Sequence, residues 1–211
     1  RNAPNRAQAR KPRSLSREAP VMVLRYTSEH FQAGGAANVA RNLRALGATT
    51  RCHGAVGRDA RGREVTLLLE RSSIDVLGVE SVPSWTTPTK PRIVAAEPRR
   101  SLQQVLRVDR EPVEPAPEDV RARIRQRVLS LAPSTDALIV SDYDYGLVDA
   151  ELGRAVAGLA REGKVVVLDP RSTCAGFEGV TAITPNVGEL ARFSGRDADA
   201  LHDERELACA A

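Results

Sequence analysis

The chain has 211 residues, enough for one large domain with a hydrophobic core. Hydrophobic residues make up 42% and charged residues 27%, which excludes a collagen, a coiled coil and a wholly disordered chain. Aromatic residues make up 3%, so we expect an aliphatic core of the kind found in parallel sheets covered by helices. No run of about 18 apolar residues is present, so no membrane-spanning helix is expected.

The net charge of +4 is concentrated at the N-terminus. Six of the 31 basic residues precede the first acidic residue, Glu18, so the remaining 25 are balanced by 27 acidic residues. We therefore expect residues 1–14 to form a basic, disordered leader, with nucleic-acid contact as the alternative role. Because the first residue is Arg1, we expect the chain to begin inside a longer one.

The cysteines and histidines are scattered along the chain. Cys52, Cys174 and Cys209 show no Cys-x-x-Cys spacing, and the three histidines form no metal-binding pattern. This distribution predicts reduced thiols in a cytoplasmic protein and gives no indication of a zinc site or a Ser-His-Asp triad.

Strand and helix patterns alternate along the chain. From residue 117 onward, helices of about 10 to 15 residues separate apolar strands, which predicts βαβ crossovers in a mostly parallel sheet with helices on both faces. The expected strands are 21–26, 49–56, 74–79, 137–140, 164–168 and 180–184. The expected helices are 36–46, 59–71 and 149–161, with two more beginning near residues 118 and 187.

The stretch 86–110 has a different pattern. Two β-like segments, 92–95 and 103–108, flank a polar turn, and the second alternates between apolar and polar residues. We expect an antiparallel flap here, not part of a buried parallel sheet.

Acidic and amide residues follow three of the expected strands. These are Asp142, Asp169, and Asn186 with Glu189 three residues later. Ligands bind at the carboxyl ends of strands in open α/β sheets, and oxygen ligands suit Mg²⁺. The alternative is that Asn186 only caps a helix, with Glu189 as its capping-box partner.

The segment Gly34-Gly35-Ala36-Ala37-Asn38 is the most distinctive motif. Two glycines at a helix start allow backbone N–H groups to approach a ligand, and an Asn amide suits sugar hydroxyls. The segment lacks the patterns of the standard nucleotide loops. The alternative is a glycine turn that simply enters a core helix.

Together these segments resemble the ribokinase/PfkB family of carbohydrate kinases, over about residues 15–195. The glycine motif, followed by Gly47, Gly57, Asp59 and Gly62, has the family's usual order. Within the family the chain is most similar to the heptose-phosphate kinase domain of bacterial ADP-heptose synthesis. The stretches that carry this similarity are 16–21, 86–90, 103–111, 141–143 and 184–186.

The resemblance implies a ribokinase-like α/β three-layer sandwich, incomplete in this chain, over residues 15–211, with a small antiparallel β lid near 20–28 and 86–110. It implies ATP as phosphoryl donor, Mg²⁺, a sugar phosphate as substrate, and a homodimer formed through the lid. The implied sugar-site residues are Gly34, Gly35 and Asn38, with Lys90, Arg92 and Arg107 as candidates for the sugar's phosphate or else as plain exposed charges. The implied nucleotide and metal residues are Asp142, Asp169, Asn186 and Glu189.

Two family features are missing from the sequence. The usual catalytic Asp lies in a Gly-Ala-Gly-Asp loop beyond the Asn-x-x-Glu element, and the first strand carries a sugar-binding Asp; neither is present. No catalytic residue is therefore assigned, and loss of such a loop should cost several orders of magnitude in rate.

We expect a truncated copy of an ATP-dependent kinase for a sugar or sugar phosphate, with D-glycero-D-manno-heptose 7-phosphate as the expected substrate. The chain alone is expected to be weakly active or inactive. The alternative is a non-catalytic remnant that binds a sugar phosphate or dimerises. Neither a membrane nor nucleic acid is an expected partner.

Overall fold

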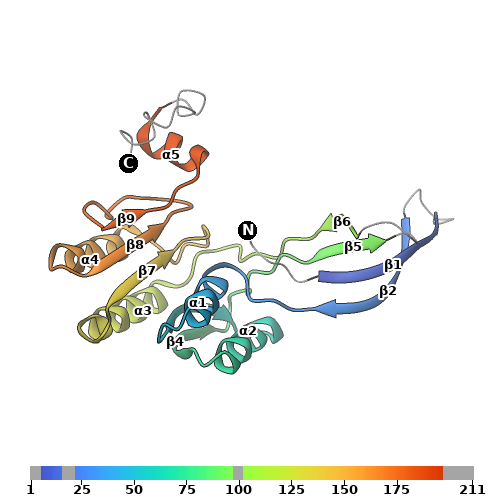
Figure 1. Ribbon diagram of the computed structural model, residues 1–211, viewed down its shortest axis with the longest axis horizontal. Helices are drawn as coiled ribbons and strands as arrows, with labels where there is room; N and C mark the ends of the chain where they lie inside the picture. Colours follow the sequence, from blue (N-terminus) through green and yellow to red (C-terminus); the bar gives the residue numbers. More distant parts are fainter. Residues whose placement is uncertain (1–5, 16–21, 97–101, 197–211) are drawn as a thin grey trace. The chain divides into compact units, whose positions relative to one another are not determined.

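The computed structural model describes residues 6–15, 22–96 and 102–196 (Figure 1). The chain divides into two compact units. Unit 1 comprises Arg1–Thr50, Val56–Ile74 and Pro83–Val113, and unit 2 comprises Arg51–Ala55, Asp75–Val82 and Glu114–Ala211. No helix within the described ranges is long and apolar enough to span a bilayer.

Unit 1 contains a four-stranded sheet in the order β2-β1-β5-β6, drawn in blue and green in Figure 1. Strand β1 pairs antiparallel with β2 and parallel with β5, and β5 pairs antiparallel with β6. The expected antiparallel flap is therefore confirmed for β5 and β6. The strands are β1 (Arg6–Leu15), β2 (Met22–His30), β5 (Arg92–Ala96) and β6 (Gln103–Arg107).

The structure corrects the expectation of a disordered leader at residues 1–14. Residues 6–14 lie in β1, between β2 and β5, with Arg6 opposite His30 on one side and Arg92 on the other. The backbone of these residues is ordered by hydrogen bonds to β2 and β5, and a basic, polar composition gives no indication of such pairing. Residues 1–5 of the expected leader, and the polar turn at 97–101, lie outside the described residues.

Two helices complete unit 1. Helix α1 (Gly35–Ala45) follows β2, and helix α2 (Ala60–Arg71) follows strand β3 (Arg51–Gly57), which crosses the boundary between the two units. Both helices begin and end within about a residue of their expected bounds, because the glycines before α1 and Asp59 before α2 are strong start signals.

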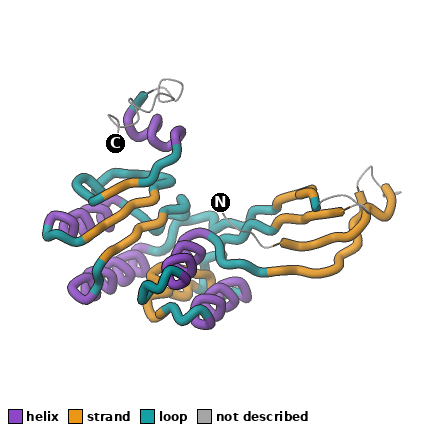
Figure 2. The backbone as a smooth tube through the Cα atoms, viewed as in Figure 1, coloured by secondary structure: helices purple, strands orange, loops and turns teal. Residues whose placement is uncertain are grey.

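Unit 2 contains the expected parallel sheet, in the order β7-β8-β9 (Figure 2). Ser141 at the end of β7 lies opposite Asp169 at the end of β8. Strand β3 pairs with β4 as a separate two-stranded sheet in the described part of the chain. The elements of unit 2 after β3 are β4 (Asp75–Val82), α3 (Glu118–Leu131), the short helix η1 (Ala132–Ser134), β7 (Ala137–Ser141), α4 (Ala150–Arg161), β8 (Val165–Asp169), β9 (Ala182–Ile183) and α5 (Val187–Ser194).

The core of unit 2 lies between β8 and α4. Val166 and Leu168 of β8 are fully buried and pack with Val156 of α4 and with Phe177. Burial of such side chains stabilises each by about 1.5–3 kcal/mol relative to exposure. This core holds the carboxyl end of β8, and with it Asp169, in a fixed place.

Helix α4 provides a matched pair of glycines for testing this packing. A Cβ on Gly153 would lie 2.7 Å from Cδ2 of Phe177, whereas one on Gly158 has no heavy atom within 4 Å. We expect Gly153→Ala to lower the free energy of unfolding by about 1–3 kcal/mol. We expect Gly158→Ala to raise it by up to about 1 kcal/mol, because alanine favours helix. Urea denaturation measures both, and equal effects of the two changes would contradict the packing described.

Candidate functional site

The glycine motif begins helix α1 in unit 1. Gly34 is the N-cap and offers no side-chain cap, and Gly35 has a φ of +53°, a conformation that residues with a Cβ rarely adopt. Asn38 is half-buried one turn into the helix, and its backbone N–H donates to the Gly34 carbonyl over 3.2 Å. In the described part of the chain no hydrogen bond to the Asn38 amide is found. The uncapped first turn and this amide are therefore available to a ligand.

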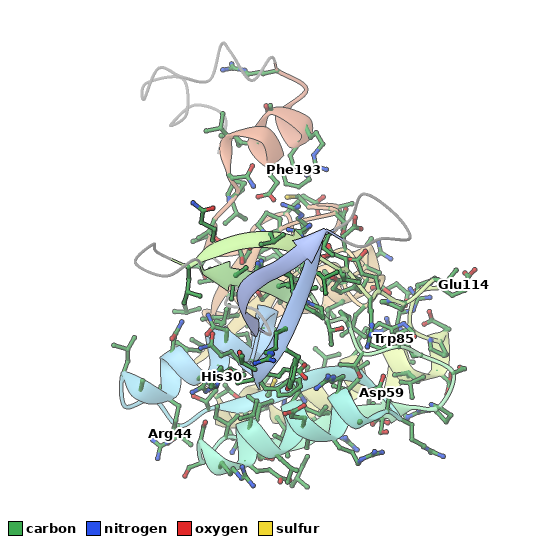
Figure 3. All side chains as sticks on the ribbon, turned by 90° about the vertical axis from the view of Figure 1, so that its right-hand side faces the viewer. His30, Arg44, Asp59, Trp85, Glu114 and Phe193 are labelled. Atoms are coloured by element: carbon green, nitrogen blue, oxygen red, sulfur yellow. The ribbon has the colours of Figure 1, made fainter. Side chains whose placement is uncertain are left out.

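A second part of the motif fixes the loop between β3 and α2. Asp59 caps α2 by accepting from Gly62 N, and it also accepts from both N and Oγ1 of Thr87, at 2.7, 2.9 and 2.8 Å respectively. Thr87 Oγ1 in turn accepts from Gly57 N over 2.8 Å. Figure 3 labels Asp59 together with Trp85, whose carbonyl lies against Gly57. The expected helix 59–71 starts at this residue, but nothing in the sequence indicates the link between Asp59 and Thr87.

These contacts alter the pKa of Asp59. Partial burial raises the pKa of this carboxyl, but the hydrogen bonds from Thr87 and Gly62 outweigh that effect and hold the pKa below its ordinary value. Asp59 therefore stays ionised well into the acidic range.

The three cations expected to contact the sugar's phosphate lie together in unit 1. Arg92 is opposite Arg107 in the β5–β6 ladder, and its guanidinium donates to the Lys90 carbonyl. Lys90 Nζ lies 3.0 Å from Asp109 Oδ2 and 2.6 Å from Glu111 Oε1. Arg107 Nε lies 2.8 Å from Asp109 Oδ1. The cluster is thus partly neutralised, and a phosphate would compete with Asp109 for Lys90 and Arg107.

In unit 2, the buried Asp142 organises the loop that follows β8. The Asp142 carboxylate is 5% exposed and accepts from the backbone of Asp144, Arg171 and Ser172 and from the Ser172 hydroxyl. Its own N–H donates to the Asp169 carbonyl over 2.9 Å. Asp142 lies at the predicted edge of the sheet, but its carboxylate is occupied by protein donors, so a contact with nucleotide stays a prediction.

Asn186 and Glu189 form the capping box that was one of the two sequence interpretations. Asn186 Oδ1 accepts from Glu189 N over 3.0 Å, and Glu189 Oε2 accepts from Asn186 N over 2.8 Å. Glu189 is only 7% exposed, and its other oxygen, Oε1, lies 3.0 Å from Nη1 of Arg171. Both carboxylate oxygens of Glu189 therefore have protein partners.

A magnesium ion fits this edge only in part. Within residues 6–15, 22–96 and 102–196, no three His, Cys, Asp or Glu side chains are grouped as metal ligands. Asp169 Oδ1 accepts from Thr184 Oγ1 over 3.1 Å, and Glu189 is engaged as described. Mg²⁺ commonly binds one or two carboxylates while substrate phosphates and waters complete its coordination. Asp169 and Glu189 fit that mode, and they do not form an all-protein cage.

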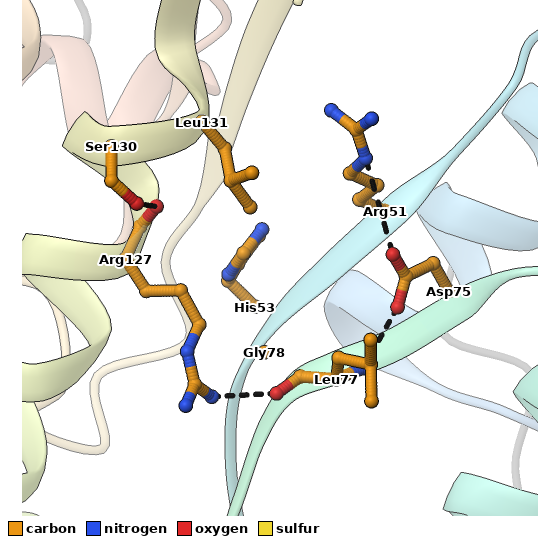
Figure 4. Close-up of a pocket in the computed structure, with 8 residues that line it drawn as sticks. All are labelled: Arg51, His53, Asp75, Leu77, Gly78, Arg127, Ser130 and Leu131. Atoms are coloured by element: carbon orange, nitrogen blue, oxygen red, sulfur yellow. Dashed lines mark hydrogen bonds and ion pairs between the residues drawn. The ribbon is translucent and has the colours of Figure 1, made fainter. Parts of the chain in front are cut away.

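A cavity of about 490 Å³ lies elsewhere in unit 2, between the β3–β4 pair and α3 (Figure 4). None of the site residues expected from the sequence lines it. Burial lowers the pKa of His53 against the opposing influence of Asp75, and Arg127 and Arg51 lower it further. The lining residues are Arg51, His53, Asp75, Leu77, Gly78, Arg127, Ser130 and Leu131.

Arg171 and Ser172 are the residues of the β8 edge that sequence analysis missed. Both directly follow Asp169-Pro170, where the strand ends. A positively charged residue at a strand end could have been predicted to contact a ligand, because ligands bind at strand ends in such sheets. Ser172 carried no comparable signal.

Two kinases are among the solved structures that share this fold. The tetrameric inhibited form of phosphofructokinase-2 from Escherichia coli superposes with a TM-score of 0.64 at 19% identity, over 99% of this chain and 65% of that one. Arabidopsis thaliana ribokinase complexed with ribose and ATP gives 0.61 at 15% identity, over 98% and 64%. The chain therefore has the α/β ribokinase-like fold.

Sequence comparison gives the family. The model of the pfkB family of carbohydrate kinases matches residues 6–211, and the chain belongs to that family. It is 38% identical over 186 residues to the bifunctional protein HldE of Gluconobacter oxydans, covering 86% of this chain and 37% of that protein. It is also 38% identical over 199 residues to HldE of Paramagnetospirillum magneticum, covering 93% and 39%. The chain thus spans less than half the length of these relatives.

The Asp59 contacts predict a pH-dependent contribution to stability. Because the folded-state pKa is lowered, the stabilisation is present above the unfolded value of about 3.9 and is lost as the pH falls through the folded value. We expect Asp59→Asn to cost about 1–3 kcal/mol at pH 7, since an amide N–H₂ then faces the donors of Thr87. The cost should shrink towards pH 3.

Urea denaturation of both proteins between pH 3 and pH 7 measures this cost. Asp136→Asn, at an exposed carboxylate, serves as the control. A cost of Asp59→Asn that is the same at every pH would contradict the assignment.

Proposed function

We propose that this chain serves ATP-dependent phosphorylation of a hydroxyl group on a sugar phosphate, with D-glycero-D-manno-heptose 7-phosphate as the substrate. The observation that carries the proposal is the uncapped first turn of α1. This turn begins at Gly34 and Gly35, and the Asn38 amide lies one turn further along the helix. Membership of the pfkB family and the similarity to HldE proteins support it.

In this proposal, unit 1 binds the sugar. The N–H groups of the first turn of α1 donate to sugar oxygens, and the Asn38 amide both donates and accepts. Lys90, Arg92 and Arg107 neutralise the phosphate already on the sugar, and Lys90 and Arg107 exchange part of their pairing with Asp109 for the new anion.

Unit 2 serves the nucleotide in the same proposal. Asn186, Glu189 and Asp142 lie at the carboxyl edge of β7–β9 and are the proposed nucleotide-site residues, with Glu189 acting through its contact with Asn186 N and not by touching phosphate. Asp169 and Glu189 are the proposed Mg²⁺ ligands, and the ion would neutralise phosphate charge when bound.

We also propose a cytoplasmic location, in keeping with the free thiols of Cys52 and Cys174.

The second candidate function is sugar-phosphate binding without phosphoryl transfer. The observation that favours it is that the 211 residues contain no Gly-Ala-Gly-Asp sequence to provide a general base. Binding and transfer are therefore tested separately.

For binding, we expect Asn38→Ala to weaken the affinity for heptose 7-phosphate by about tenfold or more, because hydrogen bonds to the sugar are lost. Asn42→Ala lies one turn further along α1, at an exposed position, and should leave the affinity unchanged. Isothermal titration calorimetry without nucleotide measures both. Equal affinities for the two variants would rule out the α1 site.

For transfer, the same preparations are assayed for ADP release with heptose 7-phosphate and Mg·ATP. Turnover by the 211 residues should lie orders of magnitude below that of typical kinases, because these residues include no Gly-Ala-Gly-Asp loop to supply the general base. Robust turnover would contradict that expectation and exclude the binding-only alternative.

We further propose that the chain forms a homodimer through the four-stranded sheet. Strands β2 and β6 are its edges, and apolar side chains remain exposed there, including Tyr26 at 66% and Leu106 at 52%. Exposed edges that carry apolar residues favour association with another chain.

Light scattering after size-exclusion chromatography tests the dimer. We expect a dimer mass for the unmodified chain and a shift towards monomer for Leu106→Glu, because a buried charge would be unpaired. Leu46→Glu changes an apolar residue that is 85% exposed outside the sheet and should leave the mass unchanged. A monomer mass for the unmodified chain would reject the proposal.

A further inference from the structure

Arg171 is held at the ligand-binding edge of unit 2 by its backbone. Its N–H donates to Asp142 Oδ2 over 3.2 Å, and its carbonyl accepts from Nη2 of Arg192 over 2.9 Å. Both sides of this residue are thus fixed without its side chain. The start of the Arg171 side chain is therefore positioned independently of what its guanidinium contacts.

The guanidinium of Arg171 is exposed, whereas its partner is buried. The side chain of Arg171 is 59% exposed, and that of Glu189, at 3.0 Å, is 9% exposed. Glu189 Oε1 accepts one of the five N–H donors that a guanidinium carries. A guanidinium anchored in this way retains donors directed to solvent, in the fork geometry that matches phosphate oxygens.

We propose that Arg171 binds the phosphates of the nucleotide, and that Glu189 holds its guanidinium until they arrive. This inference rests on the proposed function, because it assigns a further residue to the same nucleotide site. When a phosphate binds the guanidinium in place of Glu189, Glu189 Oε1 loses its protein partner and becomes available to Mg²⁺. Glu189 keeps its place in the helix because Oε2 still accepts from Asn186 N.

The purely structural alternative is that Arg171 only neutralises the buried carboxylate of Glu189. The two roles predict different results for the two halves of the pair. If the ion pair only maintains the structure, removing either charge breaks the same pair and should weaken phosphate binding alike. If Arg171 binds phosphate, removing Arg171 weakens binding, whereas removing the charge of Glu189 releases Arg171 to the ligand.

The experiment titrates inorganic tripolyphosphate, and separately ADP, into the 211-residue chain by calorimetry with EDTA present to exclude metal ions. We expect Arg171→Gln to weaken tripolyphosphate binding by about ten- to a hundred-fold, the range for a hydrogen bond between charged groups. Arg171→Lys should recover part of that loss. Glu189→Gln should bind at least as tightly as the unmodified chain, because a glutamine oxygen still accepts from Asn186 N but leaves the guanidinium unpaired.

Arg161→Gln is the control for the loss of one positive charge. Arg161 ends α4, just before β8 begins, and so lies at the opposite end of that strand from Asp169. Its removal should change the affinity by less than about twofold, because salt screens exposed charges at such separations. Circular dichroism melting of each variant checks that it is folded.

Three results would overturn the inference: equal weakening by Arg171→Gln and Glu189→Gln, no effect of Arg171→Gln, or no tripolyphosphate binding by the unmodified chain. The proposed function fails separately, if heptose 7-phosphate neither binds through Asn38 nor accepts phosphate. If Arg171→Gln weakens binding, Glu189→Gln does not, and the sugar assay fails, then the assignment of Arg171 holds and the proposed kinase activity is rejected.

Discussion

The carboxylate of Asp142 is the constraint on which the candidate nucleotide site depends. It is buried at the end of β7, and four protein donors satisfy it, three of them from Arg171 and Ser172. A buried carboxylate without such donors would be strongly destabilising. This contact fixes the loop after β8, and the fixed loop in turn directs Arg171 towards Glu189.

In both units a carboxylate at a helix start also contacts a distant segment. Asp59 is the N-cap of α2, and Glu189 is the capping-box partner of Asn186 in α5. Each also contacts a segment far away in sequence, through Thr87 and Arg171 respectively. The cap stabilises the helix by about 1 kcal/mol, and the second contact positions a polar loop beside it. In both places a helix-start residue therefore also fixes a loop, and in unit 2 that loop carries Arg171.

The sequence predicted the order of the elements well, because the signals involved are local. Asp59, the glycines before α1 and the Asn186–Glu189 spacing all define helix starts within a few residues, and each helix begins close to where it was expected. Strand β1 was missed because its stabilisation comes from backbone pairing with β2 and β5. The apolar residues among 6–14 are the alanines at positions 7 and 9, and two small side chains in alternation are too weak a pattern to reveal a strand.

The sequence by itself determined the family, the fold class and the motif that opens α1, since these depend on residue types at short spacings. Only the tertiary structure decided the partners of the charged groups. Lys90 pairs with Asp109, Arg171 pairs with Glu189, and Asp142 accepts from the loop after β8. Such pairs join residues up to 30 positions apart, and many carboxylates could have matched each cation by charge alone. In unit 2, the packing of β8 against α4 and the register of β7 with β8 select one set, because they bring those particular strand ends together. In unit 1, the β5–β6 pairing and the Thr89–Arg110 bridge place Lys90 beside Asp109.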